Sequence, residues 1–225
     1  MTEQQVQYLS QVLRLDLNAC HPQQLQRLVT AFMQRNGFTS LDNLISALRV
    51  APKLRQSLLD SLGINITQLF RDPQMWDILA KEVLPALPSE FKPLRVWDAG
   101  CSIGKKPYSL AALLYQLAPQ GAHVIIATDI DEATLTQAKR GEYPASDMKE
   151  IPVIYRPLFS IQNGLIIVPP TLKKFVKFQY LNLLNDPYPQ GIHLLVCRNL
   201  PIYFRPEVKP RIFQGFTQSL MKMES

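Results

Sequence analysis

The stretch that decides the fold reads LRVWDAGCSIGKKPYSL and spans residues 94–110. Its apolar start, Leu94–Trp97, predicts a β-strand, and a helix is expected over 107–118. Between the two stand Gly100 and Gly104. Glycines where a strand turns into a helix allow backbone N–H groups to approach a ligand, and a helix N-terminus favours negative charge. The stretch therefore predicts an α/β fold with a ligand-binding turn, although many α/β proteins need a tight turn here without binding a nucleotide.

Four more apolar runs of strand length follow the first one. They lie at 123–127, 164–168, 175–178 and 193–197, and helical patterns are found at 131–140 and 206–221. Strands that alternate with helices are typical of a mostly parallel sheet that is covered on both faces. This part of the chain is therefore expected to be an α/β domain.

The first part of the chain follows a different pattern, in which apolar residues recur at helical spacing. The three sets are Leu25, Leu28, Val29 and Phe32, then Leu41, Leu44, Ile45 and Leu48, then Leu54, Leu58, Leu59 and Leu62. Ser40 is placed to cap the second helix, and Asn36-Gly37 is placed to end the first. A linking helix with proline at its first turn is expected over 73–87. The predicted division is a small all-α domain over 1–72, a linking helix and loop over 73–92, and the α/β domain over 93–225.

The composition narrows the class of protein. The formal net charge of +6 suits an anionic partner, but the basic residues form no long block, so the charge alone indicates little. No apolar run approaches the roughly 18 residues of a membrane span, and the N-terminus lacks the pattern of a signal peptide. The three cysteines, Cys20, Cys101 and Cys197, are dispersed without a CxxC pair. They predict free thiols in a reducing cytoplasm and no metal site.

A carboxylate stands at the end of the second predicted strand. This strand ends in ATDID, residues 127–131, and Asp129 lies 25 positions beyond Gly104. An acid about 20 residues after a glycine turn can accept hydrogen bonds from two ribose hydroxyls. Asp131 is the better candidate for capping the next helix. Together the glycine turn and Asp129 favour a nucleoside-containing cofactor over a purely structural turn.

The spacing of the motifs excludes two common nucleotide sites. A phosphate-binding P-loop needs GxxxxGK[ST], but here one spacer residue is missing and Lys106 stands where the hydroxyl residue should be. The GxGxxG spacing of nicotinamide dehydrogenases is absent as well.

Polar residues also follow two later strands. Asn182 lies in the sequence YLNLL after the run at 175–178, and Arg198-Asn199 follows the run at 193–197. Polar residues just past the C-terminal ends of parallel strands lie where open α/β sheets bind ligands. A turn could use Asn199, but an Arg-Asn pair directly after an apolar strand favours a functional role.

These motifs, in this order, resemble the chemotaxis protein methyltransferases, the CheR family. The strings that carry the resemblance are NITQLFRDP (65–73), VWDAGCSIGKKPYSLA (96–111), ATDIDEATLTQAKRGEYP (127–144), LNLL (181–184) and CRNLPIYF (197–204). The resemblance implies a class I methyltransferase sheet, which is Rossmann-like, behind a helical N-terminal domain. It implies S-adenosylmethionine as donor and S-adenosylhomocysteine as product. The implied reaction converts glutamates in the cytoplasmic domain of methyl-accepting chemoreceptors into methyl esters, in chemotaxis adaptation. It is carried out in the cytoplasm by a monomer that neither enters the membrane nor binds nucleic acid.

The resemblance also implies roles for individual residues. Those expected at the cofactor are Asn65, Thr67, Arg71, Ala99, Gly100, Gly104, Asp129, Asn182, Leu183, Arg198 and Asn199. Arg71 and Tyr203 are expected at the reacting groups, where Arg71 would steer the incoming carboxylate and Tyr203 would line the methyl-transfer pocket. A glutamate is already ionised at neutral pH and needs no general base, so the rate is expected to come from positioning and exclusion of water.

Two departures from the family pattern bear on activity. The family reads GCSTGEEPYS where this chain has GCSIGKKPYS, so Lys105 and Lys106 stand where an acidic residue pairs with the ammonium group of the cofactor. Unit charges about 4 Å apart interact by roughly 4 kcal/mol at an effective dielectric near 20, so repulsion predicts weaker binding unless the lysines turn into solvent. The family also continues beyond the helix over 206–221 with a glycine turn and two strands. We therefore expect a sheet truncated at its C-terminal end, without its last strands.

Three functions stay open at this point. The first is a receptor glutamate methyltransferase with activity impaired by the two lysines and the short C-terminal end. The second is a catalytically degenerate binding or regulatory module that keeps the fold. The third is a nucleic-acid methyltransferase, which the basic charge favours but which should carry an N-P-P-Y motif where RNLPIY stands. Receptor docking through the helical domain is less strongly indicated, because the stretch over 21–35 keeps only Arg27 and Arg35 as basic residues.

Overall fold

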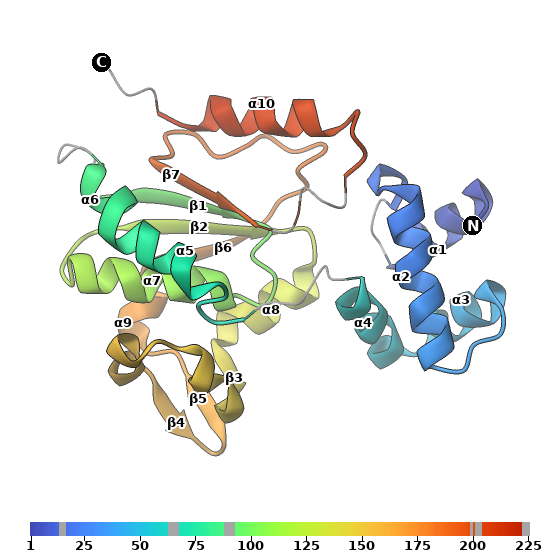
Figure 1. Cartoon of the computed structure of the whole chain (residues 1–225), viewed down its shortest axis with the longest axis horizontal. Coiled ribbons are helices and arrows are strands. Elements are labelled where there is room, and N and C mark those ends of the chain that lie inside the picture. The colour runs from blue at the N-terminus through green and yellow to red at the C-terminus, as the bar shows by residue number, and fades with distance from the viewer. Residues whose placement is uncertain (14–16, 63–67, 88–92, 199, 201–203, 222–225) are drawn as a thin grey trace. The chain divides into compact units, whose positions relative to one another are not determined.

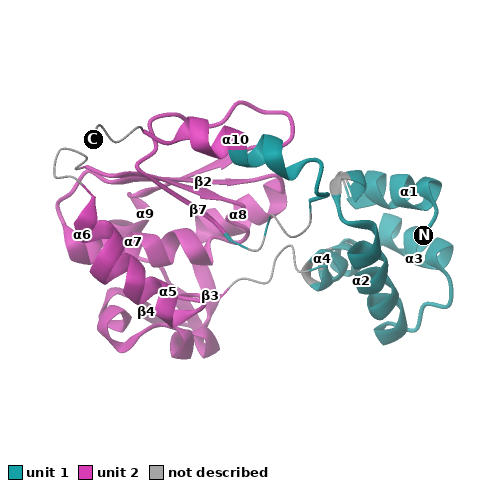
Figure 2. Ribbon diagram, turned by 45° about the horizontal axis from the view of Figure 1, so that its top comes forward, with its two compact units in different colours: residues 1–66, 198–213 teal, residues 67–197, 214–225 magenta. Residues whose placement is uncertain are grey.

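The structure is a computed structural model that describes residues 1–13, 17–62, 68–87, 93–198, 200 and 204–221. The chain divides into two compact units, which Figure 2 distinguishes by colour. Unit 1 comprises residues 1–66 and 198–213, and unit 2 comprises residues 67–197 and 214–225. The domain division predicted from the sequence stays a prediction.

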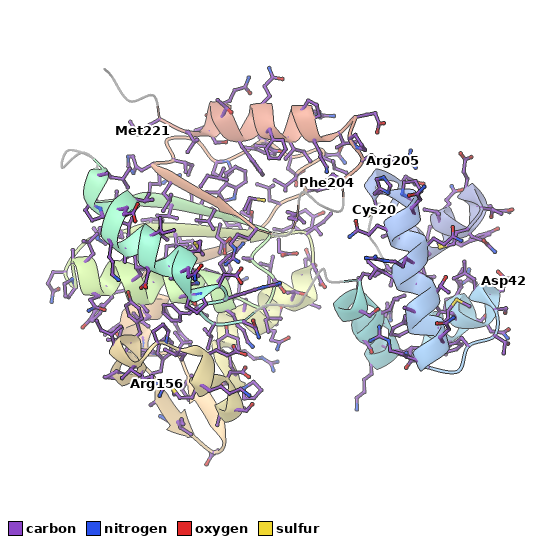
Figure 3. All side chains as sticks on the ribbon, viewed as in Figure 1. Cys20, Asp42, Arg156, Phe204, Arg205 and Met221 are labelled. Atoms are coloured by element: carbon purple, nitrogen blue, oxygen red, sulfur yellow. The ribbon has the colours of Figure 1, made fainter. Side chains whose placement is uncertain are left out.

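Unit 1 is helical, as its apolar spacing predicts. Its elements are α1 (Glu3–Leu13), the 3-10 turn Leu17–Ala19, α2 (Pro22–Arg35), α3 (Leu41–Val50) and α4 (Pro52–Ser61). The predicted stripes form one core with Leu9 and Leu13 of α1, since their leucine, valine and phenylalanine side chains are buried or partly buried together. The hydroxyl of Ser40 accepts a hydrogen bond from the Asn43 N–H at 3.2 Å, which confirms the predicted cap. Phe204 pairs with Cys20 in an isolated antiparallel bridge, and both residues are labelled in Figure 3.

The linking helix predicted over 73–87 is confirmed, with one irregular turn. The helical run consists of α5 (Pro73–Ile78), the π-helical turn Leu79–Val83 and α6 (Leu84–Ala86). Trp76, Leu79 and Leu84 are buried in the core of unit 2. An inserted π-turn rotates the following residues relative to the preceding ones, so a single 3.6-residue period does not describe this helix.

Unit 2 contains a parallel sheet of order β6-β2-β1-β7, seen in the left half of Figure 1. Its strands are β1 (Arg95–Ala99), β2 (Val124–Asp129), β6 (Val176–Tyr180) and β7 (Leu194–Cys197). The register pairs Ala99 with Thr128 and with Cys197, and pairs Asp129 with Tyr180. The C-terminal ends of the four strands therefore lie side by side. The chain continues from β1 to β2 on one side and reaches β7 on the other, so the strand order reverses at β1, where open α/β sheets bind ligands.

The helices of unit 2 cover the sheet. They are α7 (Lys105–Leu117), α8 (Glu132–Arg140), the short α9 (Pro170–Lys173) and α10 (Lys209–Ser219), whose last turns belong to this unit. Figure 1 shows α7 and α10 on opposite faces of the sheet. The fully buried Trp97 donates its indole N–H to Thr128 Oγ1 at 2.9 Å and packs edge-on against Tyr188 and Phe216. The predicted fold class, an α/β protein with a mostly parallel sheet, is confirmed.

A second sheet corrects one prediction about the strands. The apolar run at 164–168 forms β5 (Leu165–Ile167), but this strand pairs antiparallel with β3 (Glu142–Pro144) and β4 (Ser160–Gln162) instead of joining the parallel sheet. The strands β3 and β4 were not predicted from the sequence, because they have three residues each and lack a continuous apolar run. Two 3-10 segments, Ala145–Glu150 and Val153–Leu158, connect β3 to β4.

Within the described parts of the chain, no helix is both long enough and apolar enough to cross a bilayer.

Gly104 gives a test of how closely the turn after β1 packs against α8. Its φ is +86°, and a Cβ added there would lie 2.9 Å from the Cβ of Ala138 and 3.1 Å from the hydroxyl of Tyr143. We expect Gly104→Ala to lower the free energy of unfolding by about 1–2 kcal/mol through the left-handed backbone and by about 1–3 kcal/mol more through overpacking.

Gly164→Ala is the matched control for this prediction, measured by the same urea unfolding experiment. Gly164 has a φ of +75° and nothing within 4 Å of an added Cβ, so only the backbone contribution applies. Equal losses of stability in the two variants would show that the turn does not pack tightly on α8.

Candidate functional site

The turn between β1 and α7 is held by the end of β2. The N–H groups of Gly100 and Cys101 both donate to the carbonyl of Thr128 at 2.9 Å. Gly100 and Gly104 have φ values of +74° and +86°, and Ser102 has a φ of +49°. Left-handed backbone at these positions lets the chain leave the sheet and start α7 within a few residues. The predicted glycine turn is therefore present as a strand-to-helix turn.

Asp129 ties the two strand ends together. Its Oδ2 accepts the Ser102 N–H at 2.7 Å and its Oδ1 accepts the Asp131 N–H at 3.1 Å. Burial raises the pKa of this carboxyl above its ordinary value, while the backbone N–H groups of Ser102, Asp131 and Ile130 act in the opposite direction. Asp131 instead caps α8, since its Oδ1 accepts the Ala133 and Thr134 N–H groups. The predicted cap at Asp131 is therefore confirmed. Asp129 faces the glycine turn, and its predicted contact with ribose stays a prediction.

Lys106 lies inside the protein and pairs with the end of β1. Its Nζ is 2.6 Å from Oδ1 of the fully buried Asp98 and donates to the carbonyl of Gly100 at 3.4 Å. Only 8% of Lys106 is exposed. The sequence predicts that the lysines would not weaken cofactor binding if they turned into solvent. Lys106 does not turn into solvent.

Lys105 is also buried, but it points to a different group of acids. Its Nζ lies 2.8 Å from Asp147 Oδ2 and 3.9 Å from Glu150 Oε2, and 5.8 Å from the centre of the Tyr143 ring. Asp147 and Glu150 belong to the 3-10 segment that follows β3. The two adjacent lysines thus occupy separate environments, because neighbouring residues on a helix point about 100° apart.

The segment around Arg71 is fixed by its backbone. The Leu69 N–H donates to Glu150 Oε2 and the Phe70 N–H to Ser109 Oγ, both at 3.0 Å, and the carbonyl of Arg71 accepts the indole N–H of Trp76 at 2.9 Å. Phe70 has a φ of +51°. Three backbone hydrogen bonds on successive residues hold this segment in place and leave Arg71 half-buried. This anchoring is compatible with the predicted role of Arg71 and does not test it.

The loop after β6 brings Asn182 and Leu183 beside the end of β2. The Leu181 N–H donates to the carbonyl of Asp129 at 3.0 Å. The side-chain oxygen of Asn182 accepts the Leu184 N–H at 2.9 Å, and the carbonyl of Leu183 accepts the Tyr188 hydroxyl at 2.6 Å. The loop is therefore shaped by its own hydrogen bonds, next to Asp129.

The remaining predicted residues are placed only in part. Ala99 is the fully buried last residue of β1, and Arg198 directly follows Cys197, the last residue of β7. Asn65, Thr67, Asn199 and Tyr203 lie outside the described residues. The structure thus gathers the predicted residues from the ends of β1, β2 and β6 in unit 2.

The cysteines near the strand ends are poor nucleophiles. Burial chiefly raises the pKa of the Cys101 thiol well above its ordinary value, and the carboxylates of Asp129 and Asp98 raise it further. Burial raises the pKa of Cys197 to about 12. Both thiols are therefore protonated at neutral pH. Among the described residues, no group of three or more His, Cys, Asp or Glu side chains could hold a metal ion.

The roles of Asp98 and of the acids that face Lys105 were not among the predictions from the sequence. One signal for Asp98 was available: an acid inside an apolar strand needs a buried cation, and Lys105 and Lys106 follow it by seven and eight residues. The pairing of Lys105 with Asp147 had no such signal, because it depends on a short strand and a 3-10 segment that carry no clear pattern.

Comparison with known proteins agrees with this geometry. The family described as CheR methyltransferase, SAM binding domain, matches residues 65–224. The chemotaxis protein methyltransferase of Listeria innocua is 33% identical over 212 residues, which cover 93% of this chain and 81% of that protein. The chemotaxis protein methyltransferase 1 of Pseudomonas aeruginosa is 34% identical over 190 residues, which cover 79% of this chain and 69% of that protein. A chemotaxis protein methyltransferase of Borreliella burgdorferi is 32% identical over 178 residues, covering 73% and 63%.

The family match includes the glycine turn, Asp129 and the loop after β6, which the structure brings together. The chain therefore belongs to the CheR methyltransferase family, with a class I methyltransferase fold and S-adenosylmethionine as its cofactor.

Proposed function

We propose that this chain transfers the methyl group of S-adenosylmethionine to glutamate side chains in the cytoplasmic domain of chemoreceptors, and that it does so as a monomer in the cytoplasm. The observation that carries the proposal is the position of Asp129, whose carboxylate lies against the glycine turn at the point where the strand order reverses. The family and the names of its relatives support the chemotaxis role. They favour an enzyme over a binding module that has lost its donor site.

The residues present fit the nucleoside end of the cofactor. An ionised carboxylate has about four lone-pair positions, and the Ser102 and Asp131 N–H groups occupy one on each oxygen of Asp129. Capacity remains to accept ribose hydroxyls. Asn182 and Leu183 follow in the loop that donates to the Asp129 carbonyl, which supports their proposed place beside the adenine.

The proposed methyl transfer needs no general acid or general base from the protein. The bound cofactor supplies a methyl group on a sulfonium sulfur. A receptor glutamate is ionised at neutral pH, so its oxygen forms the new C–O bond as the C–S bond breaks, and no proton has to be removed. The protonated thiols of Cys101 and Cys197 do not compete as acceptors. In this proposal Arg71 orients the glutamate carboxylate and Tyr203 lines the methyl-transfer pocket.

Asp129→Asn tests the nucleoside site. The amide cannot accept from two ribose hydroxyls while it also accepts the Ser102 N–H, so S-adenosylhomocysteine should bind about ten- to a hundredfold more weakly. Isothermal titration calorimetry measures this change. Asp131→Asn is the matched control, because it removes the same charge two residues away and asparagine still caps a helix well. Wild-type affinity in Asp129→Asn would contradict the proposal.

The raised pKa of Asp129 predicts a pH dependence of binding. Ribose hydroxyls donate to the ionised carboxylate, so affinity should fall as the pH falls through the pKa of Asp129. Because burial raises that pKa, the loss should begin at a higher pH than for an ordinary aspartate, whose pKa is about 3.9. Calorimetry over a pH series should show this loss in the wild type and a flat profile in Asp129→Asn. A wild-type profile that stays flat down to the ordinary aspartate range would argue against direct contact.

The product identifies the substrate group. With methyl-labelled S-adenosylmethionine and a purified chemoreceptor cytoplasmic domain, we expect label that mild base releases as methanol, as carboxyl methyl esters do. A receptor in which the candidate glutamates are replaced by glutamine should take up no label. Label that withstands base, or that enters the glutamine variant equally, would indicate another acceptor.

Arg71→Ala tests the steering of the carboxylate. Loss of a charged hydrogen-bond donor should lower kcat/KM for the receptor by about ten- to a hundredfold. Arg140→Ala, an exposed arginine at the end of α8, is the control and should leave kcat/KM unchanged. Full activity of Arg71→Ala together with unchanged cofactor affinity would exclude the role.

A further inference from the structure

We propose that the ammonium group of Lys106 takes the place of the α-ammonium of S-adenosylmethionine at the end of β1, so that the amino-acid part of the cofactor adds little to binding. This inference rests on the proposed function, because it concerns the same cofactor site. According to this proposal, the chain binds the cofactor mainly through its nucleoside. The Lys105-Lys106 sequence alone did not predict this mode of binding.

The partners of Lys106 are those that a free α-ammonium requires. An ammonium group has three N–H donors and no acceptor, so it binds carboxylates and carbonyls. At the end of β1 the carboxylate is that of Asp98, and a carbonyl is available at Gly100. Lys106 contacts both, at 2.6 Å and 3.4 Å.

Burial favours a lasting ion pair between Lys106 and Asp98. Asp98 is fully buried and Lys106 is almost so. Removing one partner of such a pair leaves a buried charge without compensation, which is strongly unfavourable. The first turn of α7 also disfavours a cation, because the helix N-terminus is partly positive. The ion pair with Asp98 offsets both the cost of burying the ammonium group and its repulsion from the helix N-terminus. Lys106 is therefore expected to remain paired with Asp98.

A ligand that brings its own ammonium gains little under these conditions. Its cation would either approach Lys106 and be repelled, or displace Lys106 from Asp98 and exchange one ammonium–carboxylate contact for another. Lys105 does not alter this account, since its ammonium faces Asp147 and Glu150. The net contribution of the amino-acid part should therefore be small.

The test compares two ligands by calorimetry on the full chain. S-adenosylhomocysteine carries the amino-acid part, and 5′-methylthioadenosine has the same nucleoside and sulfur without it. In the wild type we expect the two affinities to agree within about fivefold, as for weak exposed charge contacts. This measurement needs no variant, so it stands whether or not a substituted chain folds.

Lys106→Met then removes the ammonium group from Asp98 while keeping a side chain of similar length. The ratio of the two affinities should rise by about ten- to a hundredfold in favour of S-adenosylhomocysteine, the effect expected of a charge-assisted hydrogen bond. The double variant Asp98→Asn/Lys106→Met should lose this gain, because the acceptor is no longer anionic. Lys105→Met is the matched control, and its ratio should equal that of the wild type.

Three outcomes would overturn the inference. A ratio that Lys106→Met leaves unchanged would mean that Lys106 does not hold the ammonium position. A wild-type ratio that is already high and falls in Lys106→Met would mean that Lys106 binds the ligand carboxylate. Absence of binding by both ligands in the wild type and in every variant would overturn the proposed function as well, whereas the first two outcomes leave the nucleoside site intact.

Discussion

Contact between the ends of β1 and β2 determines the geometry of the whole site. Two N–H groups of the glycine turn bond to the carbonyl of Thr128, and a third, from Ser102, bonds to the side chain of Asp129. The turn is therefore held by its neighbouring strand, and the hydrogen bond from Ser102 also fixes the carboxylate that would hold a nucleoside. The loop after β6 adds a hydrogen bond to the Asp129 carbonyl, so three strand ends are tied at one residue.

Charge at the start of α7 is the second constraint, because two lysines there oppose the positive end of the helix. The protein meets it with carboxylates from distant parts of unit 2: Asp98 on β1, and Asp147 and Glu150 beyond β3. Buried pairs of this kind contribute little net stability compared with apolar residues of similar volume, but they are specific about geometry. The role that we propose for the Lys106–Asp98 pair accordingly concerns ligand binding and does not depend on a contribution to stability.

Much of this fold could be predicted from the sequence, and the exceptions have physical causes. The parallel strands follow from the apolar period, and the caps at Ser40 and Asp131 follow from capping chemistry. The antiparallel sheet could not be predicted, because strands of three residues such as Glu142–Pro144 gain their stability from neighbours and carry no period of their own. The directions of the Lys105 and Lys106 side chains could not be predicted either, because a sequence does not reveal which acid a lysine will face.

The different surroundings of Lys105 and Lys106 connect the cofactor site with the segment that carries Arg71. Lys105 bonds to Glu150, and the same Glu150 oxygen accepts the Leu69 N–H, two residues before Arg71. Ser109, one turn further along α7, donates to the Lys105 carbonyl and accepts the Phe70 N–H. These contacts hold the backbone around Arg71 against the start of α7. Lys106, on the same turn, is held against β1 by its ion pair with Asp98. Arg71, which we propose to orient the methyl acceptor, and Lys106, which we propose to occupy the ammonium position, therefore both depend on the first turn of α7, without requiring a direct contact between them.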